Sequence, residues 1–181
     1  MYKLCDRGKK MGRSFLSGVI KDLVSAVAIV GMVALVAYAL AGTWPAMVAV
    51  ESGSMVPNIH IGDIVFIQCP SRVEIMTYQS GREIGHRIFG DYGDVIVFRP
   101  NGDRYETPII HRVMYWVYAG GRMPNGEVAQ HAGYITRGDN NPGYDQPHLS
   151  PVKPEWIVGV AWGRLPYLGH IRLAFDVNVT T

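Results

Sequence analysis

The stretch that decides the fold is the run from Leu23 to Val50, LVSAVAIVGMVALVAYALAGTWPAMVAV, followed directly by residues 51–58, ESGSMVPN. The run contains no Asp, Glu, Lys, Arg or His. As a helix it would reach roughly 42 Å, against a bilayer hydrocarbon thickness of about 30 Å. Because Trp44 suits a membrane interface and Pro45 removes a backbone donor, we expect the transmembrane helix to occupy residues 23–43.

A cleaved secretory signal is the alternative explanation of this run. The apolar region of such a signal normally has about 7 to 15 residues. The run from Leu23 to Val50 is nearly twice as long, with 28 residues. We therefore favour a retained membrane anchor over a signal that is removed from the mature chain.

The two flanks of the apolar run differ in charge. Residues 1–22 carry six Lys or Arg and two Asp or Glu, a balance of +4, whereas residues 51–181 carry eleven and thirteen, a balance of −2. Because basic flanks stay in the cytoplasm, we expect residues 1–22 to be a cytoplasmic tail and residues 44–181 to be an extracytoplasmic domain. The outer part has no one-sided basic stripe, so we expect no nucleic-acid partner.

The chain beyond residue 50 has a composition and pattern typical of β-structure. Short runs rich in Val, Ile, Tyr and Phe alternate with Gly, Pro, Asn and Asp, without a long helical period. The segment 76–92 is expected to be an exposed connection. Strands are expected at residues 64–68, 95–99, 109–118, 133–137 and 156–164. The sequence therefore predicts a mainly β domain on a single N-terminal transmembrane helix.

Ser54, between a glycine and a methionine just beyond the apolar run, is a candidate nucleophile. Serine reacts poorly at pH 7 until a base takes its proton. The outer domain has a single lysine, Lys153, in a Pro-rich stretch, whereas histidine occurs six times. Among these histidines His111 is the best candidate base, because the run 108–113 is an apolar strand that can aim the imidazole.

A histidine base needs an acceptor, most often a carboxylate, for its other ring nitrogen. The segment 136–145 offers Asp139 and Asp145, both in a turn just after a strand. Taken singly, Ser54, His111 and Asp139 also have ordinary explanations as turn or strand residues. The spacing fits neither a calcium loop nor a zinc site, so we expect no metal and no cofactor.

Several segments, in this order, together resemble the type I signal peptidases, in the branch found in archaea and the endoplasmic reticulum. The matching segments are Ser52-Gly53-Ser54-Met55-Val56-Pro57, Gly62-Asp63-Ile64-Val65, Gly93-Asp94-Val95-Ile96-Val97-Phe98, Ile110-His111-Arg112-Val113, and Gly138-Asp139-Asn140-Asn141 with Asp145. The Gly-Asp pieces are individually weak. The combination of Ser-Gly-Ser-Met-x-Pro, His-Arg-Val and Gly-Asp-Asn is specific, and the segments run through most of the outer domain.

The resemblance implies a membrane-bound serine endopeptidase that removes signal peptides from exported preproteins. Ser54 matches the nucleophile, and His111 falls where the bacterial branch has its lysine base. Asp139 and Asp145 match acidic positions, and we expect Asp145 to be the more critical. By the same resemblance the oxyanion would be held by the Ser54 backbone N–H and the Ser52 hydroxyl.

The resemblance also implies partners and a location. The expected partners are signal peptides of secretory preproteins and the lipid bilayer, with the translocon or other signal peptidase subunits as further candidates. The expected location is the cell membrane, single-pass with a cytoplasmic N-terminus, or the endoplasmic reticulum membrane in a eukaryote. The substrate is expected to dock as an added β-strand with two small pockets. Apolar residues around Met55 and Val56 are expected to touch lipid.

Two other functions remain open from the sequence. The first is a non-catalytic, membrane-tethered β-module in which Ser54, His111 and the aspartates are ordinary loop and strand residues. The second is a self-cleaving regulator with a related β-fold and a Ser-Lys pair, in which Lys153 would be the base. The predicted membrane span argues against the second.

Overall fold

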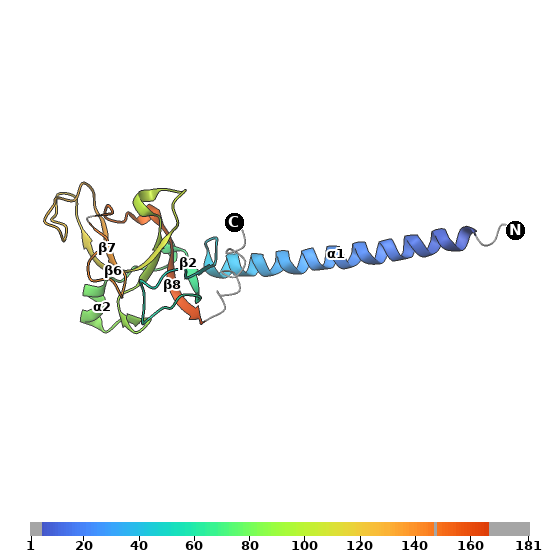
Figure 1. Cartoon of the computed structure of the whole chain (residues 1–181), viewed down its shortest axis with the longest axis horizontal. Coiled ribbons are helices and arrows are strands. Elements are labelled where there is room, and N and C mark those ends of the chain that lie inside the picture. Colours follow the sequence, from blue (N-terminus) through green and yellow to red (C-terminus); the bar gives the residue numbers. More distant parts are fainter. Residues whose placement is uncertain (1–4, 147, 167–181) are drawn as a thin grey trace, which may run out of the picture. The chain divides into compact units, whose positions relative to one another are not determined.

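The computed structural model describes residues 5–146 and 148–166, with side chains from Leu16 onward. The chain divides into two compact units, Met1–Leu40 and Ala41–Thr181. The first consists of the helix α1 (Cys5–Ala41), and the second contains the strands (Figure 1). The prediction of a mainly β domain with one N-terminal apolar helix is confirmed. The sequence also contains an N-glycosylation sequon, Asn178-Val179-Thr180, which lies outside the described residues.

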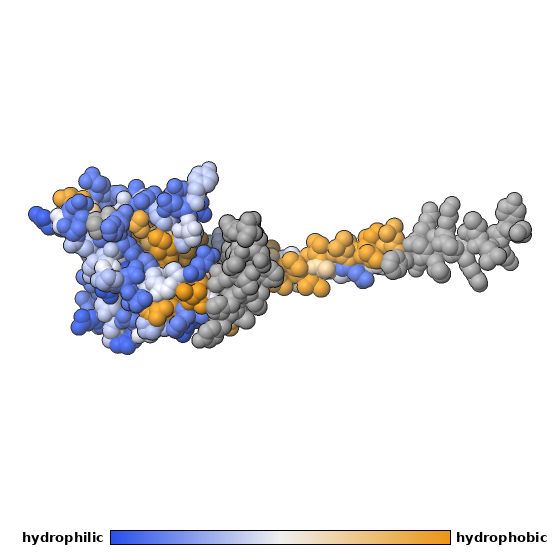
Figure 2. Space-filling view, viewed as in Figure 1, coloured by the Kyte–Doolittle hydropathy of each residue, from blue (hydrophilic) through white to orange (hydrophobic). Residues whose placement is uncertain are grey.

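One helix in the described part of the chain is long and apolar enough to cross a membrane. This stretch, Leu16–Ala41, has 26 residues, and its most apolar part is not buried inside the protein. Figure 2 shows apolar side chains along the visible face of this helix. The helix ends at Ala41, two residues before the predicted end, because Gly42 adopts a left-handed φ of 69° that stops helical hydrogen bonding.

The second unit is built on a curved antiparallel sheet (Figure 1). Its strand order is β1-β2-β8-β5-β6-β7, so the first and last strands in space are β1 and β7. The strands are β1 (Met47–Ala49), β2 (Ile64–Gln68), β5 (Val95–Phe98), β6 (Ile109–Val117), β7 (Gly133–Arg137) and β8 (Ile157–Leu165). The unit also contains a two-stranded sheet, β3 (Arg87–Ile88) with β4 (Asp91–Tyr92), and three short 3-10 helices: Pro70–Arg72, Pro100–Gly102 and Pro154–Trp156.

The five predicted strands agree with β2, β5, β6, β7 and β8 to within one residue at each end. The prediction missed β1, because its three residues continue the apolar run of the span. It also missed the helix α2 (Tyr78–Ile84), which lies in the segment predicted to be an exposed connection. This helix has only seven residues, too few for an apolar period, and starts where the Thr77 side chain accepts from the Ser80 N–H.

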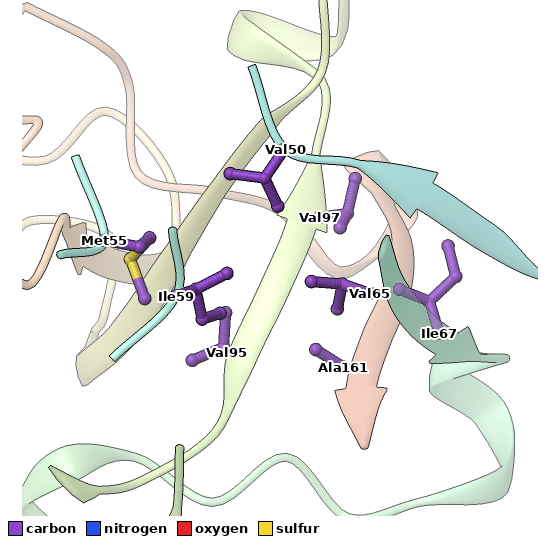
Figure 3. Packing of buried hydrophobic residues seen from close by; sticks show 8 residues of the cluster. All are labelled: Val50, Met55, Ile59, Val65, Ile67, Val95, Val97 and Ala161. Atoms are coloured by element: carbon purple, nitrogen blue, oxygen red, sulfur yellow. The ribbon is translucent and has the colours of Figure 1, made fainter. Parts of the chain in front are cut away.

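The main core cluster lies between the sheet and the loop that joins β1 to β2. Figure 3 shows Met55 and Ile59 of this loop pointing toward the buried side chains of the strands. The cluster consists of Val50, Met55, Ile59, Val65, Ile67, Val95, Val97 and Ala161. Met55 is fully buried, so the expectation that it touches lipid is wrong. Its burial, typically worth about 1.5–3 kcal/mol for a side chain of this size, anchors the loop that carries Ser54.

Candidate active site

The loop that carries Ser54 is a compact turn that is held by hydrogen bonds to the Met55 backbone. The backbone N–H groups of Asn58 and Ile59 both donate to the Met55 carbonyl, at 2.9 Å each. Ser54 itself is half-buried and lines a groove. Its hydroxyl oxygen lies 3.2 Å from that of Ser52, within hydrogen-bonding distance. The turn therefore presents two adjacent hydroxyl groups to the same groove.

His111 lies on β6, opposite Ile96 of β5 and one residue before β6 begins to pair with β7. Its Nδ1 atom lies 2.7 Å from Asp145 Oδ2, and both side chains are 8% exposed. The carboxylate accepts, so Nδ1 carries the proton and Nε2 is left as the acceptor in the neutral ring. This is the tautomer that a general base requires.

The Nε2 edge of His111 faces the Ser54 loop across Gly138. A Cβ atom built on Gly138 would lie 2.7 Å from the Ser54 carbonyl oxygen and 2.9 Å from His111 Nε2. These two atoms are therefore at most about 5.6 Å apart. Ser54 and His111 also line the same groove. Folding thus brings together two residues that are far apart in the sequence, with glycine the only residue that leaves room between them.

Asp145 and Asp139 occupy different environments. Asp145 accepts from His111 Nδ1 and, at 2.6 Å, from the Thr136 hydroxyl. Asp139 instead accepts from Arg112 Nε at 2.8 Å and Nη2 at 2.7 Å. The geometry thus places Asp145 against the imidazole and Asp139 in a bidentate ion pair one residue along β6.

The Arg112–Asp139 pair connects the Ser54 loop to the rest of the domain. Asp139 Oδ2 also accepts from Asn58 Nδ2 at 2.8 Å. Arg112, only 1% exposed, donates to backbone carbonyls of the β3–β4 region, among them Gly93 at 2.8 Å. Next to it, the Asn140 N–H donates to the Ser54 carbonyl at 2.8 Å. These bonds hold the turn after β7 against the Ser54 turn.

Lys153 is not part of this arrangement. Its Nζ atom lies 5.2 Å from the centre of the Trp156 ring, and Lys153 does not line the groove. No group of three or more His, Cys, Asp or Glu side chains within the described residues is arranged to hold a metal ion. The side chains at the site support acid–base and nucleophilic chemistry centred on Ser54 and His111.

Known proteins resemble the chain across most of its length. No family model matches it. The chain is 30% identical over 152 residues to the signal peptidase complex catalytic subunit SEC11 of Schizophyllum commune, covering 72% of this chain and 64% of that protein. It is 31% identical over 137 residues to SEC11 of Saccharomyces cerevisiae strain YJM789, covering 73% of this chain and 66% of that protein. The chain is thus similar to signal peptidase catalytic subunits over most of its length. The motif resemblance is thereby confirmed, and the chain spans just under two thirds of the length of these relatives.

A groove of about 780 Å³ runs past Ser54. Residues 48–52 and residues 107–111 contribute to its lining. Val50 exchanges backbone hydrogen bonds with the β2 side of the sheet, through Asp63 and Gly62. Because peptide groups alternate along a strand, those of Ala49 and Glu51 point the other way. The exposed edge of β1 therefore offers backbone donors and acceptors to the groove.

The start of β6 also offers backbone donors and acceptors to the groove. Val113 donates its N–H to Asp94 on the β5 side, so alternation turns the peptide groups of Ile110 away from β5. The pairing of β6 with β7 begins at Arg112 and Arg137, beyond Ile110. Ile110 thus lies where β6 has no paired residue of β7.

Sequence reasoning named Ser52, Ser54, His111, Asp139 and Asp145, and the structure brings them into one region. It did not assign roles to Thr136, Asn58, Arg112 or Asn140. Arg112 and Asn140 lie inside the quoted motifs, which was a usable signal. Asn58 and Thr136 carry no such signal, because their contacts depend on the packing of two distant turns.

Proposed function

We propose that this chain is a membrane-bound serine endopeptidase that removes N-terminal signal peptides from exported preproteins. The observation that carries the proposal is the buried His111–Asp145 pair, whose free Nε2 faces the Ser54 loop at a groove. The SEC11 relatives are named as catalytic subunits of a signal peptidase complex, which favours the same activity here. The His111–Asp145 pair stands out among histidine contacts because His111 lines the same groove as Ser54.

The proposed mechanism begins with proton transfer. The Ser54 hydroxyl turns from Ser52 toward His111 Nε2, which takes its proton as Oγ attacks the scissile carbonyl. The imidazolium that forms is stabilised by the adjacent Asp145 carboxylate. His111 then gives the proton to the leaving amine, and the acyl group stays on Ser54 as an ester. Water activated by His111 hydrolyses the ester and frees the enzyme.

The negative charge that develops on the carbonyl oxygen needs donors. The Ser54 backbone N–H and the Ser52 hydroxyl are the two proposed donors. Ser52 Oγ lies 3.2 Å from the nucleophilic oxygen, so it is close to where the tetrahedral oxyanion forms. One well-placed donor of this kind is typically worth about 10² to 10³ in rate.

Asp139 is proposed to be a positioning residue. Its two bonds to Arg112 and its bond to Asn58 tie the Ser54 turn to the turn after β7. Its side chain bonds to Arg112 and Asn58 rather than to His111 or Ser54. Its effect on the reaction would therefore run through the placement of the Ser54 loop.

The substrate is proposed to enter the groove as an extended strand. The outward peptide groups of Ala49 and Glu51 and those of Ile110 can pair with its backbone, which requires no particular side chains. Side chains that point into the groove meet Val48, Val97 and neighbouring apolar residues. A groove of this kind favours small apolar residues before the cleaved bond, as signal peptides have.

The proposed setting is a membrane crossed by the apolar helix from Leu23 to its end at Ala41, with residues 1–22 in the cytoplasm and residues 44–181 outside it. The helix length and its apolar composition support the span, and the charge difference between the flanks supports the orientation. Proposed partners are the lipid bilayer and signal peptides, with the translocon and other signal peptidase subunits as further partners. The names of the relatives favour a complex.

The function is tested with the purified full chain in detergent and a preprotein substrate. The wild type should cut once, after the signal peptide, while Ser54→Ala and His111→Ala should lose the activity with unchanged folding by circular dichroism. Lys153→Ala is the control and should cleave normally. Cleavage that survives in Ser54→Ala, or an inactive but folded wild type, would favour the non-catalytic β-module.

A further inference from the structure

Glu51 lies at the groove, three residues before the proposed nucleophile. Among the described residues that line the groove it is the only carboxylate, and His111 is the only other ionisable side chain. The Glu51 side chain is exposed. At neutral pH Glu51 therefore supplies the fixed charge of this groove. The proposed mechanism makes no use of that charge.

The direction of the Glu51 side chain follows from the strand it extends. Val50 is 1% exposed and packs in the core, so alternation places the side chains of Ala49 and Glu51 on the opposite face. Their peptide groups point into the groove, away from β2. The side chains of a substrate strand that pairs with these peptide groups alternate between the same two faces of the sheet as those of β1. Its residue opposite Glu51 then points away from the core, with Cβ atoms typically about 4.5–5.5 Å apart.

The alternation of the substrate strand indicates which residue this is. In the proposed binding mode the last residue of the signal peptide and the third from the end point into the apolar groove, where size selects them. The penultimate residue lies between these two and points outward, on the face of Glu51. The side chain of this penultimate residue does not contact the walls of the groove, so the enzyme can select it by charge but not by size.

We infer that Glu51 is a specificity-determining residue, which favours a basic and disfavours an acidic side chain at the penultimate residue of the signal peptide. The inference rests on the proposed function. Opposite charges that face each other on neighbouring strands stabilise the pairing, and like charges destabilise it. Replacing Lys by Glu at this residue of the substrate should therefore reduce kcat/KM by about threefold to tenfold. The contact is exposed, so this ratio should shrink as salt is raised to 1 M.

The test uses three preproteins that differ only at the penultimate residue of the signal peptide, with Lys, Gln or Glu there. The full chain in detergent is assayed for kcat/KM with each. The wild type should prefer Lys over Glu by the stated factor. Glu51→Gln should bring the Lys-to-Glu ratio close to one, and Glu51→Lys should reverse it. Because each ratio is taken within one variant, an overall loss of rate cancels.

Glu155→Gln is the matched control. Glu155 is an exposed acid in the 3-10 helix Pro154–Trp156 and does not line the groove, so its loss removes the same charge elsewhere. This variant should keep the wild-type ratio. A ratio that survives in Glu51→Gln, or falls equally in Glu155→Gln, would overturn the inference. Equal cleavage of all three preproteins by the wild type would also overturn it, whereas no cleavage of any would overturn the proposed function itself.

Discussion

The imidazole of His111 and the carboxylate of Asp145 form a buried pair with Nδ1 and Oδ2 2.7 Å apart. The two residues are 34 positions apart and come from different elements, β6 and the turn after β7. The Thr136 hydroxyl donates to the same carboxylate oxygen at 2.6 Å. The carboxylate is thus held against the ring from two sides, and the orientation of the imidazole is fixed before any substrate arrives.

Asp145→Asn should reduce kcat by about 10³ to 10⁴ while leaving KM nearly unchanged. The amide has a similar shape but no charge, so it cannot stabilise the imidazolium and no longer selects the tautomer with Nε2 free. Steady-state kinetics on a preprotein measures both constants. Thr136→Val is the comparison: it removes one bond to the carboxylate but leaves its charge, and should cost about tenfold or less. Asp145→Asn with nearly normal kcat would rule out the proposed role of Asp145.

Asp139→Asn should act mainly on stability. Arg112 and Asp139 are 1% and 7% exposed at their side chains, so the change leaves a buried guanidinium without its counter-charge. Breaking one partner of such a pair typically costs about 3–5 kcal/mol of unfolding free energy. Denaturant unfolding of the purified chain measures this loss. A folded, fully stable Asp139→Asn protein with no activity would instead assign Asp139 to the chemistry.

The double variant Arg112→Met with Asp139→Leu separates charge from hydrogen bonding. Removing both charges abolishes the unpaired guanidinium, so this variant should be more stable than Asp139→Asn alone. Recovery should be incomplete, because the carbonyls of Gly93 and Ile88 lose the donors that Arg112 supplies. Full recovery would mean that those carbonyl bonds contribute little.

The strands were predictable because each carries a local signal. β2 and β5 are short runs of branched and aromatic residues that each follow a Gly-Asp pair, and β7 has Tyr134, Ile135 and Thr136 before Gly138-Asp139, so burial and propensity agree. β1 had no such boundary, since Met47–Ala49 continues the apolar run that leads out of the helix. Only its pairing with β2 makes it a strand, and pairing between distant segments leaves no mark in a local window.

The active-site residues were predictable by type but not by partner. Asp139 and Asp145 follow the same strand, and nothing local says which one meets the imidazole. The structure separates them because the Asp145 N–H returns to Thr136, while Asp139 faces Arg112 and, 81 residues away, Asn58. Such contacts depend on how two turns pack, so they could not be predicted from sequence spacing.

Ser52→Ala should lower kcat by about 10² with little change in KM, because a donor to the oxyanion acts only once charge has developed. Ser52→Thr keeps a hydroxyl at the same position and should restore part of the rate. The two variants are compared by steady-state cleavage of a preprotein. Equal activity of Ser52→Ala and the wild type would remove Ser52 from the oxyanion site.

Gly138→Ala should abolish most activity through a single methyl group. That carbon would lie 2.7 Å from the Ser54 carbonyl oxygen, 2.8 Å from Asn141 Nδ2 and 2.9 Å from His111 Nε2. These distances are shorter than van der Waals contact, so the Ser54 turn and the imidazole must move apart. A shift of about 1 Å in such a site can cost around a hundredfold in rate. The overpacking should also destabilise the fold by about 1–3 kcal/mol.

Gly143→Ala is the matched control for this change, because a Cβ atom there would meet nothing within 4 Å. It lies in the same turn region after β7, two residues before Asp145, and should cleave a preprotein at close to the wild-type rate. Cleavage kinetics and thermal unfolding of the two variants are measured side by side. Normal activity in Gly138→Ala would mean that His111 and the Ser54 loop do not need their close approach. An equal loss in Gly143→Ala would show that the turn as a whole, and not the space at Gly138, limits the reaction.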